Sequence, residues 1–457
     1  MKGAISSTPR RLPALDAAFL SLERRETPMH VAALMICSLP AHAPASFVKT
    51  VVQRFRSPAT VAPPWNLKLA DVAFARLAPA VVEVSDLDYD YHVRHSALPQ
   101  PGGERELGEL VSHLHGVVLD RSRPLWTCHV IEGLQGNRFA IYLKIHHALT
   151  DGMRCLRMIE RSLSPEPGGG IRPPWEGTRD RTRPASSEPR KGAEPLSVRE
   201  WARVLQRALL PSGQHEPGDA ARVRPFAGPR SLLNGPVTNA RRVATQQLDL
   251  SRTKRLAKRA GVSLNDVFLA VCGAALRRHL DAQGGLPERS LIAAVPVSLR
   301  QEGDESSANA VGFSWATLAT DITDLRERLR VIHASTEAAK QYLRSIPAAA
   351  RPLVTTMAAT PATLIGSLGL TWLPPPMNLV ISNVPGPASH LYLGEARVEA
   401  MYPIAIPMQG QVLNITCLSY AGQLNVGFTG SRDALPHLQR LSVYAQDAFD
   451  ELEAAFA

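Results

Sequence analysis

The sequence predicts an α/β protein whose helices and strands alternate in two halves. Apolar residues recur with helical and strand spacing between residues 12 and 165, and they do so again between residues 240 and 457. The intervening stretch is basic and rich in Pro and Gly, which is typical of an interdomain linker. We therefore expect an N-terminal domain over residues 1–165, a linker over 166–239 and a C-terminal domain over 240–457.

The first half contains alternating amphipathic stretches and short apolar runs. Amphipathic stretches with apolar residues at helical spacing predict helices, and short apolar runs rich in β-branched residues predict strands. The predicted helices of this half cover residues 14–24, 104–116 and 153–163. The predicted strands cover residues 31–38, 126–131 and 139–145.

The same patterns return after the linker. They predict helices over residues 251–260, 265–281 and 435–456, the last of which is amphipathic. They predict strands over residues 241–248, 291–297, 379–382, 412–420 and 423–430. The second half is therefore an α/β unit of its own.

The most informative segment lies at the end of the strand predicted over residues 139–145. It places two adjacent histidines, His146 and His147, before an Asp-Gly pair, Asp151 and Gly152. Neighbouring side chains on a strand point to opposite faces, so one histidine can face a cleft while the other packs inside. A neutral imidazole in a cleft can take a proton from a hydroxyl or a thiol near pH 7. This pattern of residues indicates a general base.

The Asp-Gly pair has more than one interpretation. Asp151 can cap the helix that follows, or it can pair with a buried arginine and hold the turn rigid. Gly152 would let the backbone turn tightly. A lone histidine at a strand end is usually structural, and only the combined HHxxxDG pattern favours catalysis.

Several other polar residues are candidates for substrate contacts. Asn265 lies where a helix begins, so either it or Ser263 caps that helix, or its side chain binds an acyl or ester oxygen. Ser382 and Asn383 end a strand before a rigid Pro-Gly-Pro turn, where a structural role competes with a position near the reacting carbonyl. The segment Pro124-Leu125-Trp126 is predicted to be structural, with its tryptophan in the core.

Composition excludes several classes of protein. Hydrophobic residues make up 45% and charged residues 20% of the 457 residues, which is typical of a globular chain. The 5 cysteines are dispersed, which favours reduced thiols and a cytosolic setting. The sequence has neither a nucleotide-binding glycine motif nor zinc-ligand spacing, so we expect no cofactor and no metal.

The charge of the chain indicates which classes of partner it can bind. A formal net charge of +10 suits nucleic acid, an anionic membrane or a phosphate-rich substrate, and the chain has no basic module with interleaved aromatic residues for nucleic acid. The N-terminus lacks the apolar core of a secretory signal, and no unbroken apolar window is long enough for a spanning helix. A basic helix over residues 196–210 is either an interfacial helix or a surface helix docked on its own domain.

The order of these segments resembles one family over residues 12–453. HHxxxDG itself is similar to the active-site motif of the CoA-dependent acyltransferase superfamily. Within it, the chain resembles the bacterial wax ester synthase/diacylglycerol acyltransferases. The segments that carry this resemblance are Leu15-Asp16-Ala17-Ala18-Phe19-Leu20, Thr27-Pro28-Met29-His30-Val31, Pro124-Leu125-Trp126, Asn265-Asp266-Val267, Pro296-Val297-Ser298-Leu299-Arg300, Asn378-Leu379-Val380-Ile381-Ser382-Asn383-Val384-Pro385-Gly386-Pro387 and Leu413-Asn414-Ile415-Thr416.

The resemblance implies both a fold and an activity. It implies two chloramphenicol-acetyltransferase-like lobes with the active site in a channel between them. It implies transfer of an acyl group from acyl-CoA, a substrate rather than a cofactor, to a fatty alcohol or to diacylglycerol. His147 would be the general base, and His146 would support the turn. Two alternatives remain: a condensation-type enzyme that uses a carrier-bound acyl group, and a non-catalytic lipid-binding protein.

The remaining expectations concern the lipid. We expect the protein in the cytoplasm, attached peripherally to the anionic surface of the inner membrane or of lipid inclusions. The uncharged stretch over residues 352–373 carries small residues, among them Gly366. This stretch either walls the channel for the acyl or alcohol chain or packs tightly inside the C-terminal lobe.

Overall fold

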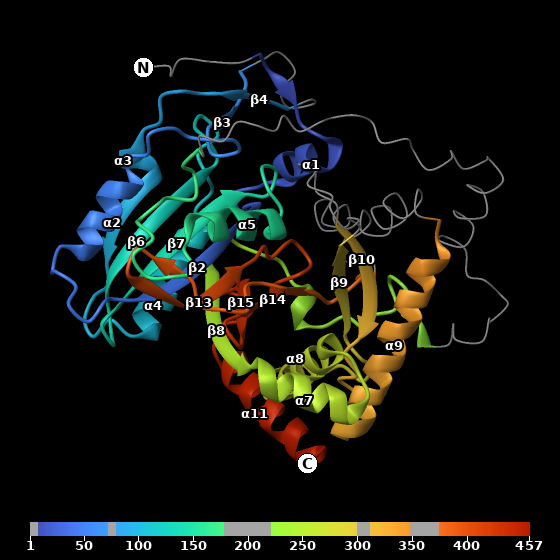
Figure 1. Cartoon of the computed structure of the whole chain (residues 1–457). Coiled ribbons are helices and arrows are strands. Elements are labelled where there is room, and N and C mark those ends of the chain that lie inside the picture. Colours follow the sequence, from blue (N-terminus) through green and yellow to red (C-terminus); the bar gives the residue numbers. More distant parts are fainter. Residues whose placement is uncertain (1–7, 72–78, 178–220, 299–310, 348–373) are drawn as a thin grey trace.

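The computed structural model describes residues 8–71, 79–177, 221–298, 311–347 and 374–457. It has two lobes, each built on a six-stranded sheet (Figure 1). Three expected features lie outside the described residues: the basic helix over 196–210, the stretch 352–373 with Gly366, and the end of the segment 296–300. The two-lobed α/β architecture expected from the sequence is confirmed.

The first lobe holds most of the N-terminal half of the chain. Its strand order is β12-β13-β2-β7-β6-β5, and a small sheet of order β1-β4-β3 lies beside it. The strands of the large sheet are β2 (His30–Ser38), β5 (Val93–Ala97), β6 (Trp126–Leu134), β7 (Arg138–His146), β12 (Tyr392–Leu393) and β13 (Ala396–Ile404). The small sheet comprises β1 (Arg10–Arg11), β3 (Leu67–Leu69) and β4 (Ala80–Glu83). The helices are α1 (Ala14–Leu22), α2 (Phe47–Phe55), α3 (Tyr89–His92), α4 (Glu104–Gly116) and α5 (Gly152–Ser162).

The second lobe holds a mixed sheet of order β10-β9-β11-β14-β15-β8. Its strands are β8 (Arg241–Asp249), β9 (Ile292–Ser298), β10 (Val311–Thr317), β11 (Leu379–Val384), β14 (Leu413–Tyr420) and β15 (Gln423–Ser431). Its helices are α7 (Leu250–Ala260), α8 (Leu264–Asp281), α9 (Leu325–Ser345) and α11 (Arg440–Ala455), and a short 3-10 helix, η2, covers Leu232–Asn234. The fully buried rings of Phe268, Phe428 and Phe449 join α8, β15 and α11 in one core.

Strand β13 of the C-terminal half of the chain joins the first sheet. β13 comes from the C-terminal part of the chain but pairs antiparallel with β2 in the first sheet, as Figure 1 shows for the red strand beside the blue one. β13 also packs against β14 and β15 of the second lobe. At this crossing, a Cβ atom on Gly427 would collide with the carbonyl of Pro403, so only glycine permits the approach. The second lobe therefore extends into the first.

The ends of the predicted linker pack as parts of the lobes. Trp175 is fully buried, donates its indole N–H to the carbonyl of Phe55 and packs against Trp65 and Trp126. Leu233 is fully buried in the core of the second lobe. Both ends of the stretch 166–239 are therefore folded structure, while residues 178–220 lie outside the described part.

Several elements were not predicted from the sequence. They include β10, the long helix α9 and strand β13, which joins the first sheet. β13 contains Pro403, a residue that normally argues against a strand within a sheet. By contrast, the predicted bounds of α4 agree with the structure, those of β2 and β8 differ by one residue at one end, and those of β7 differ by one residue at each end.

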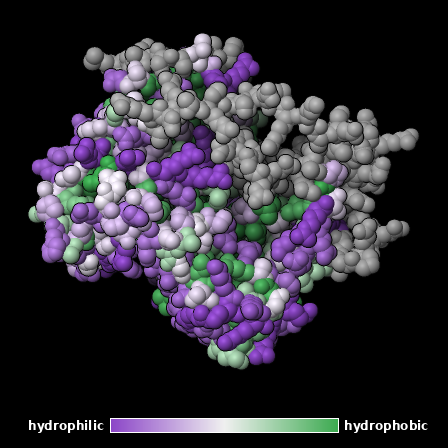
Figure 2. Space-filling model, in the orientation of Figure 1, coloured by the Kyte–Doolittle hydropathy of each residue, from purple (hydrophilic) through white to green (hydrophobic). Residues whose placement is uncertain are grey.

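Among the residues drawn in colour, hydrophilic ones predominate on the visible face, with smaller hydrophobic areas toward its middle (Figure 2). Among the described helices none is by itself long and apolar enough to cross a membrane, and α7 and α8 pass that test only as a pair bent by 102°. All five cysteines are free and buried, and burial raises the pKa of Cys155 to about 12.

Candidate active site

The HHxxxDG residues form a turn at the end of a central strand. β7 lies between β2 and β6 in the first sheet and ends at His146. His147 begins the turn, and α5 starts directly after Asp151. We call residues 146–152 the histidine turn.

Main-chain hydrogen bonds hold this turn on both sides. The His146 N–H donates to the carbonyl of Leu125 at 2.9 Å, and the His147 N–H donates to the carbonyl of Met29 at 2.9 Å. Leu125 belongs to the Pro-Leu-Trp segment, whose Trp126 is fully buried as predicted. The segments that contain Leu125 and Met29 therefore fix the position of the backbone of the turn.

His146 is the inner histidine and is fully buried. Its Nδ1 accepts a hydrogen bond from the Ala148 N–H at 3.1 Å, so the ring carries a proton on Nε2. This Nε2 lies 3.3 Å from Oε1 of Glu23, at the long end of hydrogen-bonding distance. With both nitrogens facing protein groups, His146 is placed to support the turn.

Glu23 connects this histidine to two other segments. Its carboxylate accepts hydrogen bonds from the Met29 N–H at 3.1 Å and from Nε and Nη2 of Arg121 at 3.1 and 3.0 Å. The side chain is only 5% exposed. Burial, the largest influence, raises the pKa of Glu23, but the contacts with His146, Met29 and Arg121 outweigh it and leave the pKa below its usual value.

His147 is the outer histidine and keeps partial exposure. Its ring stacks on Phe19 of α1, with centroids 4.2 Å apart and planes 24° apart. Burial of the ring lowers the pKa of His147 to about 4, Asp151 acts in the opposite direction, and His146 lowers it further. The imidazole is therefore neutral at pH 7, which is the form that accepts a proton.

Asp151 caps the helix that follows. Its Oδ1 accepts from the Arg154 N–H at 2.8 Å, at the N-terminus of α5. The expected role of Gly152 in a tight turn is wrong. Gly152 opens α5 without a left-handed backbone, and a Cβ atom there would meet nothing within 4 Å.

The predicted substrate residues of the second lobe lie on two elements. Asn265 is the second residue of α8 and is partly exposed, while the cap is Ser263, whose Oγ accepts from the Asp266 N–H at 3.2 Å. Ser382 and Asn383 are partly exposed on β11, and Asn383 Oδ1 accepts from the thiol of Cys417 at 3.2 Å. Their contact with substrate stays a prediction.

Family models match most of the chain. The model described as "Wax ester synthase/diacylglycerol acyltransferase catalytic domain" matches residues 12–268, and the "WS/DGAT C-terminal domain" matches residues 307–453. The chain belongs to the wax ester synthase/diacylglycerol acyltransferase family. It is therefore an acyltransferase, as predicted.

Similar proteins span the whole chain. O-acyltransferase WSD of Acinetobacter baylyi is 38% identical over 466 residues, covering 98% of both chains. A probable diacylglycerol O-acyltransferase of Mycobacterium tuberculosis is 40% identical, covering 96% of this chain and 98% of its own. The wax ester synthase/diacylglycerol acyltransferase of Marinobacter aquaeolei VT8 superposes with a TM-score of 0.79 at 36% identity, covering 98% of this chain and 100% of its own.

A more distant similarity shows the fold alone. The first condensation domain of the calcium-dependent antibiotic synthetase superposes with a TM-score of 0.59 at 15% identity, covering 99% of this chain and 97% of its own. This domain and the acyltransferase share the two-lobed architecture.

Sequence reasoning missed a buried polar cluster beneath the histidine turn. Nζ of Lys144 donates to the carbonyls of Leu114 and Val117 at 2.7 Å each, and burial lowers its pKa to about 7. Lys144 and His146 share one face of β7 because side chains alternate along a strand. The local sequence around Lys144 gives no sign that this side chain contacts the end of α4, because the two segments are far apart in the chain.

Two more histidines belong to this cluster. Nε2 of His30 donates to the carbonyl of His115 at 2.9 Å, and His115 in turn contacts the hydroxyl of Tyr142 at 2.8 Å. Nε2 of His115 lies 2.8 Å from the carbonyl of Ala405, directly after β13. The cluster thus reaches from β2, beside the histidine turn, to the end of β13.

We predict that Glu23→Gln lowers kcat. The amide keeps the shape of the side chain but removes the charge that faces His146 and Arg121, which loosens the histidine turn. We expect a loss on the order of ten- to a hundredfold, the usual effect of a slight misplacement of catalytic groups. Steady-state kinetics will measure it, and Glu288→Gln on the exposed surface is the control. An unchanged kcat with an intact fold would contradict this role.

We predict that acid destabilises the protein between pH 6.5 and pH 4. Burial, the largest influence, lowers the pKa of His92 to about 4 and that of His115 to about 3. A histidine whose pKa is lowered by folding leaves the folded state at its full stability above pH 6.5. As pH falls toward the pKa of the folded state, the unfolded chain binds the proton more readily, and the free energy of unfolding decreases. Each such histidine should remove roughly 2 kcal/mol of unfolding free energy between pH 7 and pH 5.

Urea unfolding at the two pH values will measure this loss. His92→Gln should reduce the difference between pH 7 and pH 5, whereas His113→Gln, at an exposed position, should leave it unchanged. The same pH dependence in His92→Gln and in the unaltered protein would contradict the assignment.

Proposed function

We propose that this acyltransferase esterifies a lipid hydroxyl with a fatty acyl group taken from acyl-CoA. The acceptor is a long-chain alcohol, a diacylglycerol or both, and the product is a storage lipid. The similarity to O-acyltransferase WSD and to diacylglycerol O-acyltransferases supports this choice. Acyl-CoA is consumed as a substrate, and no cofactor forms part of the proposal.

The observation that carries the mechanism is the contrast between the two adjacent histidines. His146 is fully buried and faces Glu23, whereas His147 keeps partial exposure and a lowered pKa. His147 therefore acts as the general base. Its neutral ring takes the proton of the acceptor hydroxyl while that oxygen attacks the thioester carbonyl carbon.

The rest of the reaction follows from this proton transfer. Attack opens the carbonyl to a tetrahedral intermediate, and its collapse breaks the carbon–sulfur bond. The protonated His147 then returns the proton to the departing CoA thiolate, which leaves as the free thiol. The acyl group passes directly to the acceptor oxygen, so no acyl-enzyme forms and the histidine ends the cycle neutral.

The neighbouring groups position this base. Phe19 stacks on its ring, and Asp151 holds the start of α5. Asn265, Ser382 and Asn383 serve as contacts for the acyl or ester group from the second lobe. A channel between the lobes brings donor and acceptor together and keeps water from hydrolysing the thioester.

The net charge of +10 supports a membrane-associated location. The protein works in the cytoplasm at the anionic surface of the inner membrane or of lipid inclusions, where its lipid substrates reside. Attraction between Lys and Arg side chains and anionic headgroups provides this attachment.

We predict that His147→Ala lowers the rate of esterification by about a hundredfold to ten-thousandfold, the usual contribution of a positioned base. Purified protein is given palmitoyl-CoA with hexadecanol or diacylglycerol, and free thiol and neutral lipid are both measured. Formation of thiol without ester in the unaltered protein would refute acyl transfer to these acceptors.

His146→Ala is the matched comparison. Because His146 is fully buried, its removal should mainly lower the melting temperature and should reduce the rate less than His147→Ala does. A folded His146→Ala protein that is less active than His147→Ala would reverse the two roles.

We predict that the protein binds vesicles containing phosphatidylglycerol and that binding weakens as salt rises from 0.05 to 0.5 M. Co-sedimentation with anionic and with purely zwitterionic vesicles will measure it. Equal binding to both vesicle types at every salt concentration would contradict electrostatic attachment.

A further inference from the structure

The C-terminal end of α4 is held by side chains from the two strands that border the histidine turn. The last carbonyls of a helix have no partner within the helix, so other groups must provide the donors. Nζ of Lys144 on β7 donates to the carbonyls of Leu114 and Val117 at 2.7 Å each, and Nε2 of His30 on β2 donates to the carbonyl of His115 at 2.9 Å. Lys144 and His30 are both buried. β7 and β2 therefore fix the place where α4 ends.

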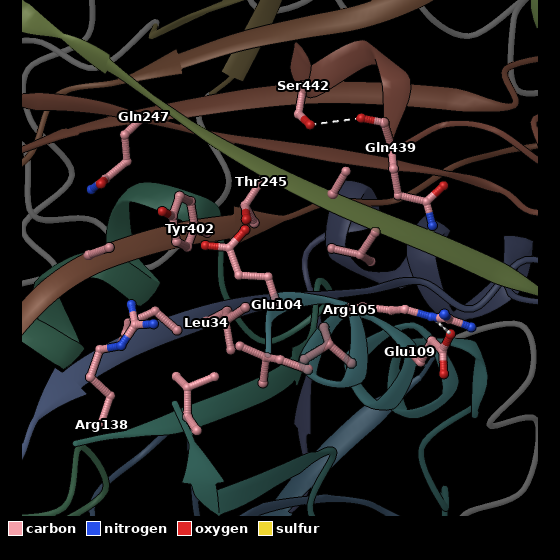
Figure 3. Close-up of a pocket in the computed structure, with 18 of the residues that line it drawn as sticks. Leu34, Glu104, Arg105, Glu109, Arg138, Thr245, Gln247, Tyr402, Gln439 and Ser442 are labelled. Carbon is pink, nitrogen blue, oxygen red and sulfur yellow. Dashed lines mark hydrogen bonds and ion pairs between the residues drawn. The ribbon is translucent and has the colours of Figure 1, made fainter. Parts of the chain in front are cut away.

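The N-terminal part of α4 lies beside a cavity instead. The cavity has a volume of about 340 Å³ and lies between the lobes, with Glu104, Arg105 and Glu109 of α4 beside it in Figure 3. The residues of α4 that line it lie between Glu104 and Val111, so the last turn of the helix is outside it. Side chains next to a cavity have fewer packing partners, so the C-terminal end is the better fixed end of α4.

Residues 117–125 connect this helix end to the inner histidine. The segment starts at Val117, whose carbonyl accepts from Lys144. It ends at Leu125, whose carbonyl accepts from the His146 N–H at 2.9 Å. Both ends of the segment are thus hydrogen-bonded to β7, at residues that are two positions apart in that strand.

Arg121 links the middle of this segment to Glu23. Nε and Nη2 of Arg121 donate to Oε2 of Glu23, and Nη2 also donates to the carbonyl of Leu20 at 2.6 Å. The other carboxylate oxygen of Glu23 faces His146. A shift of residues 117–125 would therefore disturb both the main-chain partner and the carboxylate partner of His146.

We propose that Lys144 is a positioning residue for acyl transfer. Its ammonium group fixes the start of residues 117–125, and this segment holds His146, which directly precedes the base His147. Lys144 thus acts through the protein and not on the substrate. The inference rests on the proposed role of His147 and extends it to a lysine outside the HHxxxDG motif.

The first test is Lys144→Met, which keeps an unbranched side chain of similar length and removes the ammonium group. We expect kcat with palmitoyl-CoA and hexadecanol to fall about tenfold or more while KM for palmitoyl-CoA stays unchanged, because a misplaced base slows the reaction without removing substrate contacts. Lys49→Met, on the exposed side of α2, is the control and should change neither constant.

The assays are run at a temperature at which circular dichroism shows each variant to be folded. A lysine that only stabilises the fold does not change the kcat of folded molecules. A lower melting temperature of Lys144→Met with an unchanged kcat would therefore overturn the proposal.

A double-variant cycle tests the route through residues 117–125. Arg121→Met removes the link to Glu23 at a side chain that is 46% exposed, so the variant should fold. If Lys144 and Arg121 act through one segment, the double variant should lose at least about threefold less kcat than the product of the two single losses. Arg121→Met combined with Lys49→Met should give the full product. The full product in the Lys144→Met double variant would contradict this route.

Val118→Gly tests the same route without altering Lys144 or the core. Val118 follows α4 and is 38% exposed, so glycine there adds backbone freedom at the start of the segment and removes no buried side chain. We expect kcat to fall about threefold or more with an unchanged KM, whereas the matched Val118→Ala should keep the kcat of the unaltered protein. An equal kcat in the glycine and alanine variants would sink the proposal, including where Lys144→Met does not fold.

The outcomes separate this inference from the proposed function. Free thiol without ester in the unaltered protein, or full turnover in His147→Ala, would refute the proposed function. Normal ester formation by the unaltered protein, with loss in His147→Ala and an unchanged kcat in Lys144→Met, would refute the role of Lys144 alone.

Discussion

The position of His147 depends on two main-chain hydrogen bonds and one buried carboxylate. Leu125 and Met29 provide the carbonyls that hold the backbone of the two histidines, and Glu23 faces the inner one. The surrounding contacts serve the same end. Arg121 balances the charge of Glu23, and Phe19 supports the outer ring from the helix that leads to Glu23. Because this region is buried, each hydrogen bond is stronger than it would be in water, and an unpaired polar group would cost more free energy.

The lobes are held together by strand pairing as well as by surface contact. β13 completes the first sheet while it packs on the second, and Gly427 allows that crossing. Near the base of α4, His115 reaches the carbonyl of Ala405, and Nη2 of Arg241 donates to the carbonyl of Glu26 at 2.9 Å. His115 also contacts Tyr142 of β7, so one of these contacts reaches the strand that ends in the histidine turn.

Burial controls the protonation states of this region. It keeps several imidazoles neutral at physiological pH and lowers the pKa of Lys144 to about 7. The neutral form of His147 suits a base that must first accept a proton and then release it to a thiolate. The same burial makes the fold sensitive to acid, because neutral buried histidines must become charged on unfolding. Burial therefore accounts both for the neutral form of His147 and for the sensitivity of the fold to acid.

The sequence by itself determined the family, the two α/β halves and the position of the histidine turn, because these depend on local periodicity and on HHxxxDG. It also indicated that His146 and His147 would differ, since side chains alternate along a strand. Only the tertiary structure decided which one is enclosed, and it alone brought Glu23 and Arg121 to His146. It also moved β13 into the first sheet and formed the cavity between the lobes. Contacts between residues far apart in the chain leave no periodic pattern, so they arise only when the sheets and helices pack.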